Sequence, residues 1–299
     1  MKTLKADDYV NVILKDSNKK LSERLSAHVV ALRSPIQLGL DTIVRREIED
    51  LVENTSKKNV KSLAVVLETN GGYIEVVERI YAVLRKHFTK VDFVVPNYAY
   101  SAGTVLVLSG DEIYMDYYSV LGPIDPQIEN SEGKMVPGLG YLAKFDELLS
   151  AINKDKTGTA SRAELAYLIK KFDPATLFLL EQARNHSASL LKEWLSKHKF
   201  KDWDKTESGG QQVTEEMRQK RAEEIAAILC KAERWHSHGR GIDLKVLSSD
   251  EIKLKIIDFG TDDNLNKLIR GYYDLFTDFS HKTGAKSAIH TERGLRRIQ

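Results

Sequence analysis

The sequence predicts an α/β fold, in which a parallel β-α-β core is followed by a mostly helical C-terminal extension. Three observations lead to this prediction. Between residues 27 and 115, short apolar runs rich in β-branched residues alternate with stretches whose apolar residues recur at helical spacing, and this alternation implies parallel strands joined by right-handed crossovers. Two of the runs end in turns of small residues, where open sheets of this kind place their sites. From about residue 141 onward, helical periodicity dominates.

The core elements can be assigned in order along the chain. Residues 1–26 are polar and charged and are expected to form a helical or loose N-terminal arm. Asp41 is the expected N-cap of the first core helix, because a carboxylate at this position accepts hydrogen bonds from the open N–H groups of the first turn. Strands are predicted at 27–32, 63–67, 91–95 and 112–115, and helices at 42–52, 73–87 and 102–109.

The C-terminal half is predicted to be helical. Asp173 followed by Pro174 is typical of an N-cap and a first helical turn. Helices are predicted at 142–152, 161–172, 174–198, 214–235 and 265–279, with a further helix capped by residues 248–251. The chain therefore divides into an arm at 1–26, a core at 27–137, a helical extension at 138–280 that packs on the core, and a polar tail at 281–299 whose composition is compatible with disorder.

Composition excludes several classes of protein. The 299 residues carry a net charge of +2, with 42% hydrophobic and 29% charged residues, so there is no case for bulk attraction to nucleic acid or to a membrane surface. The chain has a single cysteine, Cys230, which excludes an internal disulfide framework. Cys230 is expected to be a small core residue of a helix. The first residues lack the apolar centre of a signal peptide, and no stretch approaches ~18 uninterrupted apolar residues. The expected location is therefore cytoplasmic, without a membrane span.

The most informative stretch is residues 97–110, which reads N-Y-A-Y-S-A-G-T-V-L-V-L-S-G. Ser101 is predicted to lie at a sharp bend between a strand and a helix, where open backbone N–H groups favour a developing negative charge. The small residues Ala99, Ala102 and Gly103 would let a substrate backbone approach the hydroxyl. Ser101 is thus a candidate nucleophile, and the alternative is that it is an N-cap, the usual role of a serine at a helix start.

A second turn supports the first. The segment K-S-L-A-V-V-L-E-T-N-G-G predicts a strand that ends in the pair Gly71 and Gly72, followed by a helix. This turn would leave a bare backbone N–H pointing into a cleft, as an oxyanion donor must. The alternative is an ordinary tight turn between strand and helix, which Asn-Gly-Gly also suits.

Together these segments resemble the Clp protease/crotonase superfamily, and more closely its signal-peptide-peptidase-A-like branch named the serine dehydrogenase proteinase family. The resemblance covers residues 29–128, through T-N-G-G-Y-I, A-Y-S-A-G-T and L-G-P-I-D-P-Q, with a weaker echo at 236–242. Gly72 and Ser101 are 101 − 72 = 29 positions apart, the offset expected in Clp-type peptidases between oxyanion glycine and nucleophile. The resemblance implies an ATP-independent serine peptidase with Ser101 as nucleophile and the amides of Gly72 and Ala102 as the oxyanion hole.

The general base is left open between a lysine and a histidine. Clp-type peptidases carry a histidine about a strand's length after the serine, whereas this chain has Asp125-Pro126-Gln127 there. In the signal-peptide-peptidase-A-like branch a neutral, buried lysine acts as the base. That implies Lys144, which lies in an apolar stretch, ahead of Lys154 and Lys156, which look exposed.

The histidine alternative comes from the motif W-H-S-H-G-R-G-I, in which His238 or His236 would reach the site on a rigid loop. The same pair could bind a metal, but no further cluster of ligands accompanies it, so the sequence predicts no metal and no cofactor. Structural capping or packing is the other interpretation of these histidines.

The cleft is expected to be lined by Gly71, Tyr98, Tyr100 and Asp125, although either tyrosine could be core packing and Asp125 could stabilise a turn. The expected partners are a peptide or protein substrate and further copies of the chain, because the superfamily assembles into dimers or rings. Two other functions compete with the peptidase: a catalytically inactive Clp-like scaffold, and a crotonase-like enzyme that uses the same amides to hold the enolate of an acyl-thioester.

Overall fold

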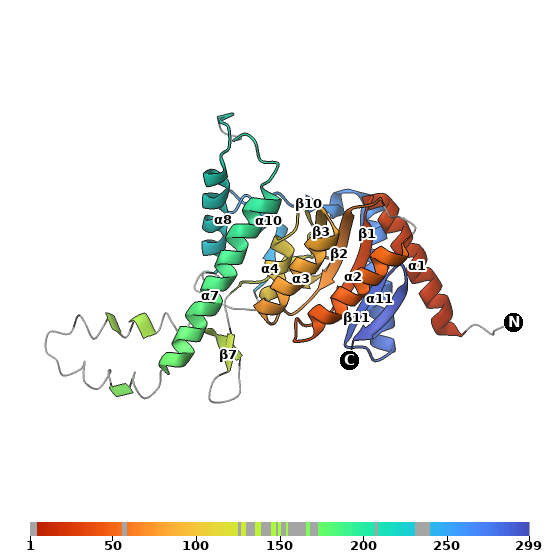
Figure 1. Cartoon of the computed structure of the whole chain (residues 1–299), viewed down its shortest axis with the longest axis horizontal. Helices are drawn as coiled ribbons and strands as arrows, with labels where there is room; N and C mark the ends of the chain where they lie inside the picture. The colour runs from red at the N-terminus through yellow and green to blue at the C-terminus, as the bar shows by residue number, and fades with distance from the viewer. Residues whose placement is uncertain are drawn as a thin grey trace.

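The fold is a central β-sheet with helices on both faces (Figure 1). The structure is a computed structural model, and the residues that it describes are 5–55, 59–124, 127–129, 135–138, 145–147, 149–150, 154, 166–167, 173–206, 209–230 and 240–298.

The main sheet contains seven strands in the order β10-β5-β3-β2-β1-β11-β12. Its parallel strands are β1 (His28–Arg33), β2 (Ser62–Glu68), β3 (Lys90–Val94), β5 (Ile113–Met115) and β10 (Ile257–Asp258). The inner strands are almost continuously apolar because both faces of a parallel sheet are covered. The predicted parallel core is therefore confirmed, and the ends of its strands fall within two residues of the expected positions.

Alternate residues of each strand enter two separate cores. Val30 and Leu32 of β1 pack with α2 (Leu40–Asn54), α3 (Ile74–His87) and α4 (Ala102–Leu108). Val29 and Ala31 face the opposite way, where α1 (Ala6–Leu25) and α11 (Asp263–Lys282) cover the sheet. Because successive strand residues point to opposite faces, one apolar run is enough to supply both cores.

A smaller sheet lies at the carboxyl edge of the main strands. It consists of β4 (Tyr98–Ala99), β6 (Val120–Leu121) and β9 (Ile242–Asp243). β4 pairs with β6 in parallel, and β9 pairs with β6 in the antiparallel direction. A separate antiparallel pair is formed by β7 (Gln127–Glu129) and β8 (Met135–Pro137).

The helices α7 (Pro174–Trp194) and α8 (Glu215–Leu229) of the extension stand at the opposite end of the molecule from α1 (Figure 1). α7 passes into a π-helical turn (Leu195–Lys199), and α8 packs against both. The carboxylate of Asp173 accepts the Thr176 N–H at 2.9 Å, which confirms the predicted N-cap. Trp194 stacks on Tyr81 of α3 with ring centroids 4.2 Å apart, so the end of α7 packs against α3.

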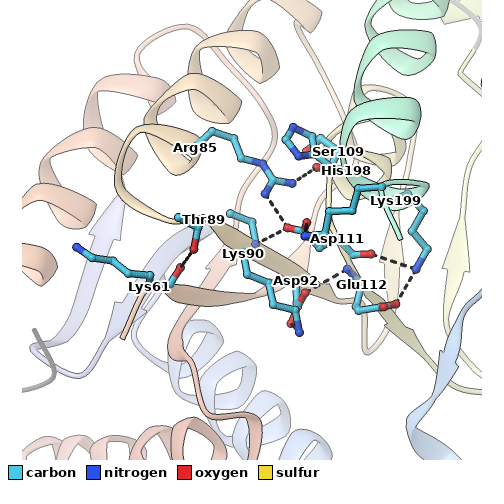
Figure 2. Close-up of polar contacts among 12 residues, drawn as sticks. Lys61, Arg85, Thr89, Lys90, Asp92, Ser109, Asp111, Glu112, His198 and Lys199 are labelled. Atoms are coloured by element: carbon cyan, nitrogen blue, oxygen red, sulfur yellow. Dashed lines mark hydrogen bonds and ion pairs between the residues drawn. The ribbon is translucent and has the colours of Figure 1, made fainter. Parts of the chain in front are cut away.

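A buried carboxylate joins the extension to the amino edge of the sheet (Figure 2). Asp111 is 4% exposed and accepts hydrogen bonds from Arg85 of α3 at 2.6 Å, from the Val91 N–H at 2.7 Å and from Lys201. Lys199, from the π-helical turn, donates to Glu112 at 2.7 Å. Burial opposes ionisation of Asp111, but these hydrogen bonds and the Arg85 charge outweigh it and lower the pKa of its carboxyl.

The C-terminal residues differ from the predicted polar tail. Residues 287–298 form an antiparallel hairpin of β11 (Ser287–Thr291) and β12 (Gly294–Ile298), and β11 pairs with β1. The sequence S-A-I-H-T is too short and too weakly apolar to predict a strand by itself. It forms one because the edge of β1 offers open hydrogen-bonding groups that a strand satisfies.

Two further predictions are corrected. No helix begins at residues 248–251, where the chain makes turns and continues to β10. The N-terminal arm forms the helix α1, one of the two forms expected for it, and α1 packs against α11 on one face of the sheet. Both α11 and β10 thus belong to the core layers, although the sequence places them in the extension. Among the described residues, no helix combines the length and the apolar character that crossing a membrane requires.

The hairpin buries a histidine between β1 and the helices that cover it. His290 is 0% exposed, and its Nδ1 lies 2.7 Å from the Tyr272 hydroxyl. Asn18 of α1 donates to the same hydroxyl at 3.1 Å. The His290 Nε2 is buried and has no hydrogen-bond partner in the described part of the chain. Burial, helped by the charge of Lys15, lowers the pKa of His290 from 6.5 to about 3.

Acidification is expected to destabilise the protein through His290. Because its pKa is lower in the folded than in the unfolded chain, the stabilising contribution is complete above pH 6.5 and is lost as the pH falls toward about 3. His290→Gln should lower the free energy of unfolding at neutral pH but make it fall less between about pH 6.5 and pH 4. Urea denaturation across this range measures both effects. The exposed His281 of α11 provides the control His281→Gln, and identical pH profiles for the two variants would contradict the prediction.

Candidate active site

Two turns meet at the carboxyl edge of the sheet. One follows β2 and contains Gly71 and Gly72, and the other follows β4 and contains Ser101. The backbones are joined directly, because the Thr69 N–H donates to the Tyr98 carbonyl at 3.2 Å and the Tyr100 N–H donates to the Thr69 carbonyl at 3.0 Å. The bridge between Thr69, just after β2, and Ala99 of β4 thus brings the two turns side by side.

The backbone of Ser101 is strained. Its φ is 53° and its ψ is −122°, and only Ser26 and Lys253 share a positive φ among the other described non-glycine residues. A side chain in such a region costs on the order of 1–3 kcal/mol and persists where the surroundings impose it, often at active sites. The hydroxyl caps no N–H of α4 and makes no hydrogen bond within the described part of the chain. The structure therefore does not support the N-cap interpretation of Ser101.

Only glycine fits at position 71. A Cβ on Gly71, whose φ is +89°, would lie 2.5 Å from the Tyr100 carbonyl oxygen, 2.8 Å from the Ser101 Cβ and 3.3 Å from the Ala102 nitrogen. Each of the first two distances is shorter than a non-bonded contact allows, so any side chain would push the two turns apart. The absence of a side chain at Gly71 is what lets the turns touch.

Gly72 is held from the other side by the loop after β1. The Ile36 N–H donates to the Gly71 carbonyl at 2.8 Å, and the Tyr73 N–H donates to the Ile36 carbonyl at 2.9 Å. A Cβ on Gly72, whose φ is +149°, would lie 2.1 Å from the Ile36 carbonyl oxygen. The second glycine is therefore required for close approach to the loop after β1.

Two backbone amides beside the serine lack an acceptor. Within the described residues, neither the Gly72 N–H nor the Ala102 N–H makes a hydrogen bond. Their neighbours are satisfied: the Gly71 N–H donates to the Thr69 Oγ1 at 3.1 Å, and the Gly103 N–H donates to the Tyr100 carbonyl at 2.8 Å. Since most backbone amides in proteins have a partner, two amides without one in the glycine turn and the serine turn are available to bind an oxyanion.

Thr104 ties the serine turn to β4 and to the residue that follows β6. Its side chain is fully buried, and its Oγ1 lies 2.8 Å from the Ala99 carbonyl oxygen and 2.9 Å from the Gly122 carbonyl oxygen. The same oxygen accepts the Gly122 N–H at 3.0 Å. Gly103 allows α4 to approach β2, because a Cβ there would lie 2.3 Å from the Thr69 side chain.

A buried carboxylate lies at the end of β2, one residue before Thr69. Glu68 is 6% exposed and accepts hydrogen bonds from the Arg33 Nε at 2.8 Å, from Asn97 at 3.1 Å and from the Tyr273 hydroxyl of α11. Burial, followed by the hydrogen bond to Glu68, raises the pKa of Tyr273. Sequence reasoning missed this cluster, although Arg33 and Glu68 are the charged residues that end two apolar runs.

The two predicted lining tyrosines stack on each other. The rings of Tyr98 and Tyr100 are 5.0 Å apart with an interplanar angle of 17°. Burial raises the pKa of both hydroxyls, although each ring remains partly exposed. Gly122 makes room for Tyr100, because a Cβ on this glycine would lie 2.5 Å from the ring.

The structure thus brings Ser101 together with Ala102, Gly71, Gly72, Tyr98 and Tyr100. The other predicted site residues, Lys144, His238 and Asp125, lie outside the described residues, as do His236 and Lys156. Lys154 is described and is exposed. In the described part of the chain, no three metal-ligating side chains gather closely enough to hold an ion.

Residues 43–138 match the family described as ClpP-like SDH-type serine proteinase. The matched range begins in α2 and ends just after β8, so it includes the Gly71-Gly72 turn and Ser101. This match agrees with the resemblance carried by the sequence motifs, and with the observed parallel α/β core and helical C-terminal part of a Clp-protease-like fold.

Two relatives are uncharacterized proteins of Methanocaldococcus jannaschii. MJ1495 is 41% identical over 110 residues, which are 36% of this chain and 38% of the relative. MJ0137 is 38% identical over 68 residues, which are 23% of this chain and 24% of the relative. The matched segment thus spans less than two fifths of the length of either protein.

Two solved structures are similar, both of variants of the 1510-N membrane-bound stomatin-specific protease. A lysine-to-alanine variant in complex with a substrate peptide has a TM-score of 0.42 and 14% identity, covering 80% of this chain and 77% of that chain. A serine-to-alanine variant has a TM-score of 0.33 and 17% identity, covering 46% and 68%.

Removing the Thr104 hydroxyl is expected to destabilise the site. Thr104→Val keeps the shape of the side chain but leaves the buried Gly122 carbonyl without its donor, while the Ala99 carbonyl and the Gly122 N–H keep only their hydrogen bond to each other at 3.1 Å. This should cost about 1–3 kcal/mol of unfolding free energy in urea denaturation. Thr277→Val is the matched control, because the Thr277 hydroxyl donates only to carbonyls of its own helix, and its cost should stay within about 0.5 kcal/mol. Equal stability of the two variants would contradict this account of Thr104.

Proposed function

Because residues 43–138 belong to the ClpP-like SDH-type serine proteinases, we propose that this chain is a serine peptidase whose nucleophile is Ser101. The observation that carries the proposal is the strained serine turn packed against Gly71, with two amides beside it that have no acceptor among the described residues. A hydroxyl, a site for the oxyanion and an open approach for a peptide backbone are what acyl transfer requires.

The proposed reaction proceeds through an acyl-enzyme. The Ser101 Oγ attacks the carbonyl carbon of the scissile peptide while a general base takes the hydroxyl proton. The negative charge that forms on the carbonyl oxygen is accepted by the amides of Gly72 and Ala102. The C–N bond then breaks, the proton passes to the leaving amine, and water hydrolyses the ester to release the acyl part and restore the serine.

The substrate is proposed to be an extended segment of a peptide or protein. Its backbone would lie along the Gly71-Gly72 turn, where an added strand can form main-chain hydrogen bonds. Tyr98, Tyr100 and Asp125 would line the cleft on the side of the serine turn. We also propose that the chain assembles with further copies of itself through the helices that flank the sheet.

The proposed general base is Lys144, with His238 as the alternative. A lysine can accept the serine proton only when it is uncharged, and burial in apolar surroundings achieves this by lowering the lysine pKa. Lys144 lies in the apolar stretch Y-L-A-K-F, 43 residues after Ser101 (144 − 101 = 43). A histidine base would instead require the segment around His238 to reach the serine turn.

The alternatives explain the geometry less well. A non-catalytic scaffold has no use for a strained backbone at Ser101, which lowers stability without adding a contact. A crotonase-like enzyme would use the two amides, but it would not need a hydroxyl at the turn.

Loss of the hydroxyl is expected to abolish activity. Ser101→Ala should eliminate covalent labelling by a fluorophosphonate probe and reduce hydrolysis of fluorescein-labelled casein on the order of 10⁴-fold or more. Ser189→Ala, at an exposed position of α7, should leave both unchanged. Persistent labelling of Ser101→Ala, or no labelling of the wild-type chain between neutral and strongly alkaline pH, would contradict the proposal.

The base is identified by a second set of variants. If Lys144 is the base, kcat/KM for labelled casein should rise as the pH increases through the lysine pKa, because only the neutral amine accepts the proton. Lys144→Ala should then lose activity, whereas the exposed Lys154→Ala and the variant His238→Ala retain it. Loss in His238→Ala alone would assign the histidine, and full activity in both Lys144→Ala and His238→Ala would exclude the two candidates.

A further inference from the structure

Two adjacent tyrosines project into solvent near the serine turn. Tyr117 is 86% exposed and Tyr118 is 59% exposed, and their rings meet edge to face with centroids 6.3 Å apart. They follow β5 and therefore lie at the same carboxyl edge of the sheet as Ser101. Neighbouring exposed aromatic rings are characteristic of surfaces that bind a partner, because leaving them in water forgoes the free energy of burying them.

The turn that carries these tyrosines is rigid. Asp116 is fully buried, and its Oδ1 accepts the Tyr118 N–H at 3.0 Å and the Ser119 N–H at 3.2 Å. The Ser119 Oγ in turn accepts the Asp116 N–H at 2.9 Å. The two buried side chains thus satisfy the backbone of the turn from inside, and the tyrosines are held in place without being covered.

Arg270 of α11 also holds this turn in place. It donates to the Asp116 carboxylate through Nε at 3.2 Å and to the Pro96 carbonyl at 2.7 Å. Its guanidinium lies 5.6 Å from the centroid of the Tyr118 ring and 5.5 Å from that of Phe259, within the range of a cation–π contact. Because Asp116 neutralises the arginine, the Tyr118 ring lies beside a closed ion pair and not beside a free charge.

The tyrosines continue to the candidate nucleophile. Tyr118 is followed by Ser119 and then by β6, in which Val120 pairs with Tyr98 of β4. Tyr100 stacks on Tyr98 and immediately precedes Ser101. Tyr117, Tyr118, Tyr100 and Tyr98, which we name the tyrosine row, therefore run from open solvent to the serine turn.

We propose that the tyrosine row is an extended substrate-binding surface, on which Tyr117 and Tyr118 bind large apolar or aromatic side chains of an unfolded polypeptide segment. This inference rests on the proposed function, because it assigns the same polypeptide to the row and to the serine. The rings offer apolar area and little charge, so they favour apolar over acidic or basic segments. Their fixed positions keep the entropic cost of binding low.

The test measures binding apart from hydrolysis. Fluorescence anisotropy is recorded with the Ser101→Ala variant of the 299-residue chain. One fluorescein-labelled Gly-Ser peptide carries phenylalanines, and a second peptide of the same length carries asparagines at those positions. The phenylalanine peptide should bind more tightly. Adding Tyr117→Ser and Tyr118→Ser together should weaken its Kd about tenfold, which is about 1.4 kcal/mol, and should change the asparagine peptide little. Tyr9→Ser is the matched control, because Tyr9 lies on α1 with the same 59% exposure as Tyr118.

The outcomes separate this proposal from the peptidase proposal. In a chain that keeps Ser101, the double tyrosine variant should label normally with fluorophosphonate and show a raised KM with little change in kcat. An unchanged Kd of the double tyrosine variant for the phenylalanine peptide would contradict the proposed binding role of the tyrosine row. So would a failure of the Ser101→Ala chain to bind this peptide. A smaller assembly in size-exclusion chromatography would also overturn this role, since the rings would then be a subunit contact. Normal peptide binding without fluorophosphonate labelling would refute the hydrolysis and leave the binding surface standing.

Discussion

The candidate site depends on a single close contact between two backbones. Gly71 approaches the serine turn so closely that a Cβ would lie 2.8 Å from the Ser101 Cβ. The contact is maintained by the pairing of Thr69 with β4 on one side and by the hydrogen bonds of Ile36 on the other. Because a strained backbone persists only where its surroundings impose it, this three-strand arrangement is the reason that Ser101 can keep a positive φ.

The C-terminal helix α11 supports the site from the opposite face of the sheet. Tyr273 reaches Glu68 at the end of β2, and Arg270 reaches Asp116 and the Pro96 carbonyl. Both carboxylates are buried, and removing one partner of such a group is costly because the other is left unsatisfied in the interior. The two clusters therefore couple the turns after β2, β3 and β5 to one helix, and the carboxyl edge of the sheet behaves as one rigid unit.

Much of the core was predictable because its signals are local. Apolar runs at 63–67 and 91–95 are strands in the structure, and the spacing of apolar residues identified α2 and α3. The motifs around Gly72 and Ser101 could be recognised in the sequence for the same reason, since each turn is specified by a few adjacent residues. The hairpin at 287–298 and the buried partners Arg33 and Tyr273 were not predicted, because their roles come from residues distant in the chain.

The sequence by itself determined the parallel core, the serine and glycine turns and the family that residues 43–138 match, since periodicity and short motifs are properties of neighbouring residues. Only the tertiary structure decided that Gly71 touches the serine turn, that the Gly72 N–H has no acceptor among the described residues, and that Tyr117 and Tyr118 are exposed after β5. It also decided that the polar C-terminal segment completes the sheet. These facts depend on which strand edges and side chains meet in space, and sequence spacing does not encode such meetings directly.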